Sequence, residues 1–122
     1  MKYEEIEKKI GVKFSNKDLL KNAFTHRSYL NEHKDEDIEN NERLEFLGDA
    51  VLELIISANL FHNYPDKAEG ELTSIRAALV RTESIAEETK KLGLGEYLRM
   101  SKGEEESGGK EKTYLLANLY EA

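Results

Sequence analysis

The sequence contains no cysteine and only one proline among its 122 residues. The lack of cysteine excludes disulfides, thiolate metal sites and a cysteine nucleophile, and it fits a reducing compartment. Any metal ion must therefore be bound by oxygen or histidine ligands. The scarcity of proline, together with many Leu, Glu, Lys and Ala residues, favours helices over strands.

Long hydrophobic runs are also missing, because no apolar stretch approaches the roughly 18 residues that span a bilayer. The first residues, MKYEEIEKKI, carry acids where a secretion signal needs an apolar segment. We therefore expect a cytoplasmic protein with no membrane association. Positive charge is in deficit, with a formal net charge of -7, so binding to a polyanion would need metal cations or a partner domain.

The length of 122 residues suits one domain with a single core, since domains most often contain about 100 to 150 residues. Hydrophobic periodicity and capping residues predict helices over residues 3–10, 15–24, 41–64, 69–80, 82–93 and 112–122. Ser15 and Thr82 are expected to cap the second and fifth of these helices. Residues 25–33 show no clear period, and the acidic stretch HKDEDIENNE at 33–42 and residues 99–112 are expected to be loops. The prediction is a compact all-α domain over residues 1–122, with the last helix incomplete at Ala122 and no second domain.

Four acids of the longest predicted helix fall within an arc of roughly 80°, at about 100° per residue. This acidic stripe consists of Glu42, Glu45, Asp49 and Glu53. The opposite face carries an apolar stripe, which consists of Leu44, Leu47, Val51, Leu54, Ala58 and Phe61. Charged faces of amphipathic helices usually lie in water, so the simplest interpretation of the acidic stripe is a solvated surface.

Two details point away from a purely solvated face. Phe46 and Ile56 project to either side of the acidic stripe, where large apolar groups are expected to be covered by another surface. Gly48 costs about 1 kcal/mol relative to Ala inside a helix, which suggests that another backbone comes close at this position. We therefore expect the acids to lie near a packed interface.

Crowded acids need a cation, because two carboxylates about 4 Å apart repel each other by about 4 kcal/mol at an effective dielectric constant of about 20. Mg²⁺ or Mn²⁺ suits carboxylates that have no cysteine or histidine partner. One helix supplies only one wall of a metal site, so further ligands must come from elsewhere. The candidates are Glu69, just after the helix, and Asn118 with Glu121, which share a face of the last helix.

The string NERLEFLGDAVL at residues 41–52 closely resembles the signature of the ribonuclease III family. Further blocks are similar to that family in the same order along the chain: THRSY at 25–29, EGELTSIRAALV at 69–80, LGLGEYL at 92–98, SGG at 107–109 and the closing ANLYEA. The resemblance covers essentially the whole chain. It implies an all-helical endonuclease domain that forms a homodimer and cuts double-stranded RNA with Mg²⁺, with Mn²⁺ as a substitute.

The resemblance also implies roles for individual acids. Glu45 and Asp49 match metal-binding carboxylates of the family, and Glu121 matches its catalytic glutamate. Asp49 and Glu121 are therefore the expected catalytic residues. Glu42 and Glu69 match two further acids of the family's active-site valley, and their part in the chemistry is less direct.

Phe46 matches the aromatic residue that inserts into a pocket of the partner subunit in the family. Asn118 is a departure, because the family usually has Asp at this position; an amide oxygen can still bind Mg²⁺, but it brings no charge. The expected reaction is phosphodiester hydrolysis by an activated water, which leaves a 5′-phosphate, a 3′-hydroxyl and staggered ends. Asn118 and the end of the chain at Ala122 leave an alternative, an inactive module for dimerisation or RNA binding. A third alternative is an acidic helical interaction domain without metal.

Residues outside the signature carry weaker signals. His26 is expected to be a hydrogen-bonded structural residue. Tyr29, Tyr97 and Tyr114 are expected to be core or edge residues rather than platforms for stacked bases, since no basic groove interleaves them. The scattered basic residues are expected to be surface charges without an assigned RNA contact: Arg43, Lys67, Arg76, Arg81, Arg99, Lys102, Lys110 and Lys112.

Overall fold

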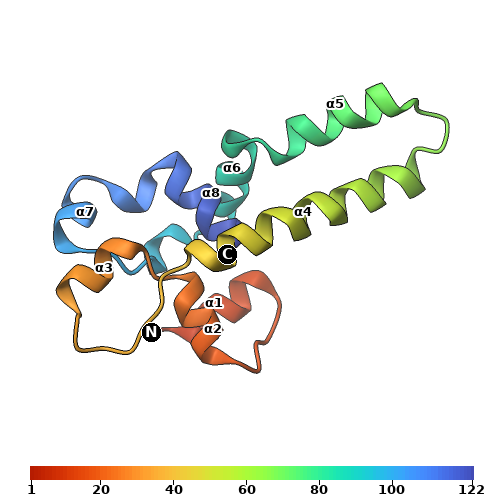
Figure 1. Cartoon of the computed structure of the whole chain (residues 1–122). Coiled ribbons are helices and arrows are strands. Elements are labelled where there is room, and N and C mark those ends of the chain that lie inside the picture. The colour runs from red at the N-terminus through yellow and green to blue at the C-terminus, as the bar shows by residue number, and fades with distance from the viewer.

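The computed structural model describes residues 1–122 and is built from helices alone (Figure 1). In chain order the elements are α1 (Tyr3–Ile10), α2 (Lys17–Ala23), α3 (Arg27–Glu32), α4 (Glu42–Asn63), α5 (Glu69–Val80), α6 (Thr82–Leu92), the 3-10 helix η1 (Gly95–Tyr97), α7 (Lys102–Glu106), the 3-10 helix η2 (Gly109–Glu111) and α8 (Thr113–Glu121). The expected all-α class is confirmed. None of these helices combines the length and the apolar character that crossing a lipid bilayer requires.

The long helices begin and end close to the residues that the sequence predicts. α4 ends just before Pro65, and α5 spans the predicted residues. Gly11 and Gly93 end α1 and α6 with left-handed φ angles of 79° and 63°, a conformation that glycine adopts without a steric cost. Glycine and proline therefore mark the ends of these helices reliably.

Three local predictions are wrong. The cap of α2 is Asn16 rather than Ser15, because its side chain accepts hydrogen bonds from the backbone N–H groups of Asp18 and Leu19 at 3.0 and 3.2 Å. Thr82 is the first residue of α6 and provides no side-chain cap. The loop expected over residues 99–112 contains α7, and residues 25–33, where no helix was expected, contain α3; their five and six residues are too few to show a helical period.

The last helix, α8, lies between α4 and α6 in the middle of the fold (Figure 1). Its Leu115 and Leu119 join a core cluster with side chains of α1, α2 and the segment around η1. Leu116 and Ala117 pack on the other side, against α6. The hydroxyl of the buried Thr89 on α6 donates to the carbonyl oxygen of Leu116 at 2.8 Å. α8 is therefore held on two sides by apolar packing and on one of them by a buried hydrogen bond.

Helix α4 crosses α8 at Gly48. A Cβ atom at this position would lie 1.5 Å from the carbonyl oxygen of Glu121, which is far inside van der Waals contact. This distance confirms the prediction that Gly48 marks the close approach of another backbone. The crossing places the acidic stripe of α4 against the C-terminal turn of α8.

Helices α4 and α5 form a hairpin that projects from the rest of the molecule (Figure 1). In 22 and 12 residues the two helices contribute one fully buried side chain, Leu60. Most of the apolar stripe is exposed, with Leu54 and Phe61 at 70% and 69% of their full accessibility. Only Leu44, at the base of the hairpin, packs against the core. Most of the apolar stripe is therefore a surface of this chain and not part of its interior.

Phe46, next to the acidic stripe, is 83% exposed, whereas Ile56 is partly buried. The expected covering surface for Phe46 is thus not supplied by this chain.

Arg99 is an exception among the basic residues that were expected at the surface. Its side chain is 15% exposed, and its guanidinium lies 4.1 Å from the centroid of the Tyr29 ring. It also pairs with Glu36 at 3.7 Å, and its backbone bridges to that of Thr25. Arg99 therefore fastens α3 and the acidic loop after it to the core.

Replacing Gly48 with alanine should separate α4 from α8. The added methyl group would collide with backbone rather than with a flexible side chain, so we expect the free energy of unfolding to fall by about 3 kcal/mol or more. Urea unfolding followed by circular dichroism measures this loss. The matched control is Gly70→Ala in α5, where a Cβ meets nothing within 4 Å; it should leave stability unchanged or raise it by about 0.5 kcal/mol. Equal stabilities of the two variants would contradict the close crossing.

Candidate functional site

Acids from two helices lie close together where α4 crosses α8. Glu45 and Asp49 are one turn apart on α4, and Glu121 is in the last turn of α8. Gly48 precedes Asp49 directly, and its contact with the backbone of Glu121 brings the two chain segments together. The structure therefore gathers the two α4 acids and the α8 acid that the sequence singles out.

The charges of these three acids act on one another. Burial, followed by the charges of Asp49 and Glu45, raises the pKa of Glu121 to about 7. Burial, followed by the charges of Glu42 and Asp49, raises the pKa of Glu45 above its usual value. Both shifts have the same cause, because burial and neighbouring negative charge each disfavour an ionised carboxylate.

The acidic stripe is neutralised only at its two ends. Glu42 lies 4.0 Å from the guanidinium of Arg27, and Glu53 lies 3.6 Å from that of Arg76. The inner acids, Glu45 and Asp49, form no ion pair, and neither does Glu121 on α8. The fold therefore leaves negative charge uncompensated at the helix crossing.

Asn118 lies one turn before Glu121 on α8. With its amide oriented to suit its neighbours, the NH₂ group donates to Oε1 of Glu45 at 3.3 Å and to the carbonyl oxygen of Tyr114 at 3.0 Å. An aspartate here would face Glu45 with another negative charge. The amide therefore stabilises the ionised form of Glu45 and leaves its own oxygen available as an acceptor or ligand.

The donors at the crossing suit a hard divalent cation in their chemistry. All are oxygen atoms, and no positively charged side chain pairs with the three central acids. No three acidic or histidine side chains, however, converge closely enough to hold a metal ion by themselves. Mg²⁺ is commonly held by one or two carboxylates, with water and substrate phosphate as its other ligands. The residues fit such a partly hydrated ion, with Glu45, Asp49, Glu121 and the oxygen of Asn118 as candidate ligands.

Glu69 does not join this group within one chain. It begins α5 at the far end of the projecting hairpin (Figure 1). The rise of about 1.5 Å per residue places the end of α4 about 27 Å beyond Glu45. Glu69 therefore cannot share a metal ion with Glu45 of the same chain. Glu42, in contrast, lies in the first turn of α4, one turn before Glu45.

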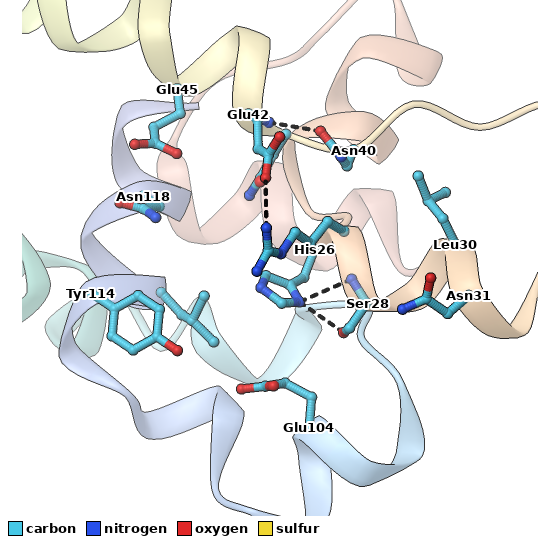
Figure 2. A pocket seen from close by; sticks show the side chains of 13 residues that line it. His26, Ser28, Leu30, Asn31, Asn40, Glu42, Glu45, Glu104, Tyr114 and Asn118 are labelled. Carbon is cyan, nitrogen blue, oxygen red and sulfur yellow. Dashed lines mark hydrogen bonds and ion pairs between the residues drawn. The ribbon is translucent and has the colours of Figure 1, made fainter.

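A pocket of about 720 Å³ adjoins the acids on the side of Glu42, Glu45 and Asn118 (Figure 2). Its walls are side chains from segments 26–31, 40–45 and 114–118, together with Glu104 of α7. Only three of its 13 lining residues are hydrophobic. This polar pocket is therefore suited to a ligand with several hydrogen-bonding groups.

His26 is the N-cap of α3 and one wall of the polar pocket. Its Nδ1 accepts a hydrogen bond from the backbone N–H of Ser28 at 3.2 Å and lies 2.7 Å from the Ser28 hydroxyl. These contacts confirm the structural role expected for His26. Burial, which outweighs the opposing charge of Glu104, lowers its pKa. The ring is thus neutral at pH 7, and with Nδ1 acting as an acceptor its proton is on Nε2.

Sequence reasoning missed Tyr114. Its side chain is 53% exposed, so Tyr114 is an edge residue and not a core residue, and it also lines the polar pocket, which was not expected. A signal was present in the sequence, because Tyr114, Asn118 and Glu121 recur at the spacing of one helical face.

The raised pKa of Glu121 makes stability depend on pH. Between its usual value of 4.5 and about 7, the folded protein keeps a proton that the unfolded chain has released. Stability should therefore decline as pH rises through this window, and the loss should be complete above pH 7. Glu121→Gln should decline less, which urea unfolding at about pH 5 and about pH 8 will show. Identical pH dependence of the variant and the wild type would contradict the crowding of these acids.

Comparison with known proteins gives a consistent result. Residues 16–122 match the family model described as Ribonuclease-III-like. The chain is 52% identical over 119 residues to Ribonuclease 3 of Streptococcus thermophilus and 50% identical over 120 residues to that of Listeria monocytogenes. Each match covers 98% of this chain and 52% of the relative, so the chain spans about half the length of these relatives.

Solved structures agree with the sequence comparison. The nuclease domain of ribonuclease III from Campylobacter jejuni superposes with a TM-score of 0.87 and 44% sequence identity, over 97% of this chain and 78% of that one. A second structure of the same nuclease domain gives a TM-score of 0.86. At this identity and coverage the likeness extends to sequence and fold together. The chain belongs to the ribonuclease III family.

Proposed function

We propose that this chain is the nuclease domain of a Mg²⁺-dependent endoribonuclease that hydrolyses double-stranded RNA during RNA processing. The observation that carries the proposal is the uncompensated group of Glu45, Asp49 and Glu121 at the α4–α8 crossing. Membership of the ribonuclease III family adds weight, because the relatives are named Ribonuclease 3.

The three acids and the amide oxygen of Asn118 would hold Mg²⁺, for which Mn²⁺ is a chemically similar substitute. Bound there, the ion would supply an activated water and neutralise charge on the phosphate that is attacked. The side chains would position and hold the cation, and the amide of Asn118 donates to Oε1 of Glu45, which orients that carboxylate. No side chain has to act as a nucleophile. The proposed products are a 5′-phosphate and a 3′-hydroxyl.

We further propose that two copies of the chain associate through the projecting hairpin. The apolar stripe and Phe46 together form an exposed apolar surface, of a kind that monomeric soluble proteins rarely carry. The Campylobacter jejuni structure is described as flexible in a region involved in dimer formation. A second copy is also the only source from which Glu69 can approach the acids at the crossing. Two such sites, each cutting one strand, would give staggered ends.

The competing proposal is an RNA-binding or dimerisation module that does not cleave. Asn118 favours it, because the amide supplies one negative charge fewer to a cation than an aspartate would. Incubation of the protein with a long RNA duplex, with and without Mg²⁺, separates the two proposals. Cleavage only with Mg²⁺ supports the enzyme, and binding without cleavage supports the module.

Glu121→Gln should reduce Mg²⁺-dependent cleavage of duplex RNA on the order of 100-fold or more, because it removes a charged ligand from the proposed site. Gel analysis of a labelled duplex measures the rate. Glu4→Gln on α1 is the control, since this exposed acid lies far from the crossing in the chain and forms no ion pair. An unchanged rate for the Glu121 variant would remove this residue from the site.

Phe46→Ala should weaken self-association about 30-fold if Phe46 is an anchor of the proposed dimer. Sedimentation equilibrium over a range of protein concentrations gives the dissociation constant. The control is Val12→Ala, which removes an exposed apolar side chain outside the hairpin. A monomeric wild-type protein, or equal dissociation constants for the two variants, would contradict the proposed interface.

A further inference from the structure

The ring of Tyr114 lines the polar pocket one helical turn before Asn118 on α8. It is 53% exposed and pairs with no other aromatic ring, in contrast to Tyr29, which stacks on His33 with centroids 3.7 Å apart. Its hydroxyl forms no hydrogen bond within the protein. Tyr114 therefore offers a free aromatic face and a free polar group beside the acids.

The side chains of the pocket offer no free positive charge to a phosphate. The one cation in the lining, Arg27, is paired with Glu42 at 4.0 Å. Glu104 is already bonded to Lys112 at 2.6 Å, which holds the pKa of its carboxyl below the usual range. The charge left over in the lining is that of Glu45, which is negative. Away from the proposed cation an anion would be repelled, whereas an uncharged ring with donors and acceptors would not.

Hydrogen-bonding groups line the pocket, and His26 lies nearer to Tyr114 than Asn31 or Asn40 does in Figure 2. Nδ1 of His26 is directed to Ser28, which leaves the protonated Nε2 as a donor. The Asn31 amide forms no hydrogen bond within the protein, and Asn40 uses only its oxygen, for the N–H of Glu42 at 3.0 Å. The pocket volume of about 720 Å³ lies within the roughly 300–1,000 Å³ of small-ligand sites.

We propose that the polar pocket binds one unpaired nucleobase of the RNA strand, stacked on Tyr114 and hydrogen-bonded by His26, beside the phosphate that is cleaved. This inference rests on the proposed cleavage of RNA. A paired base has its Watson–Crick edge occupied by its partner and its faces covered by neighbours in the stack, so it can satisfy neither the ring nor the donors. An unpaired base has a free Watson–Crick edge for the hydrogen bonds and a free face for the ring of Tyr114. The domain should therefore bind a duplex that is interrupted next to the cut more tightly than a continuous duplex, which it also binds.

The test compares a perfectly paired RNA duplex with the same duplex that carries one unpaired nucleotide, moved step by step along the strand. Fluorescence anisotropy with Ca²⁺ in place of Mg²⁺ measures binding, and a gel of the same samples checks that the RNA stays intact. The wild type should bind the interrupted duplex more tightly at one position of the unpaired nucleotide. Tyr114→Ala should weaken that binding by about 5-fold to 150-fold, the range observed for loss of one base–aromatic stack, and Tyr114→Phe should retain it.

Tyr120→Ala is the matched control, because Tyr120 is also exposed on α8 but does not line the pocket. It should bind both RNAs as the wild type does. NMR gives a second measurement, since stacking should shift the ring resonances of Tyr114 upfield when the interrupted duplex is added. An equal preference in the wild type and in Tyr114→Ala overturns the inference, as does the lack of any preference in the wild type.

The same RNAs separate this inference from the proposed function. If the perfect duplex is cleaved with Mg²⁺ and the interrupted one is not preferred, the proposed enzyme activity is supported and the base-binding pocket is contradicted. If the interrupted duplex is preferred through Tyr114 but neither RNA is cleaved, the pocket is supported and the proposed enzyme activity is contradicted.

Discussion

The close contact between Gly48 on α4 and the backbone of Glu121 on α8 is the constraint on which the site depends. Only a residue without a Cβ lets the two helices cross at this distance. The crossing carries Glu121 to Glu45 and Asp49, which come from a segment more than seventy positions earlier in the chain. The same helix α8 is anchored on its other side by Leu116 and by the buried hydroxyl of Thr89. Core packing and site geometry are therefore set by one helix.

In this arrangement, apolar packing and the repulsion between acids act against each other. The apolar contacts of α8 bury Glu121 and bring it to two acids that repel it, and burial together with these charges raises its pKa to about 7. Charged groups at the ends of the acidic stripe are paired with Arg27 and Arg76, so the conflict is confined to the crossing. Such unfavourable crowding of acids is typical of functional sites, where the charges bind a ligand and do not stabilise the fold. The α4–α5 hairpin is also unfavourable for the stability of the single chain, because its apolar side chains are exposed to water.

Much of the fold follows from local signals in the sequence. Gly11, Gly93 and Pro65 end their helices where expected, and Gly48 correctly indicates a backbone contact. The short helices α3 and α7 are missed because they have too few residues to show a period and depend on tertiary contacts for their stability. The exposure of the apolar stripe does not follow from the sequence, because periodicity identifies a face of a helix but not what covers it.

The features of the candidate site also fall into those that the sequence determines and those that only the tertiary structure determines. The sequence by itself determined the residue types, the shared face of the acidic stripe and the likeness to one family, since these depend only on order and spacing along the chain. Tertiary structure decided that Glu121 meets Glu45 and Asp49, that Glu69 lies far away, and that Tyr114 lines a polar pocket. Distances between residues far apart in the chain result from how helices pack, and packing depends on side-chain shape over the whole core rather than on any local pattern.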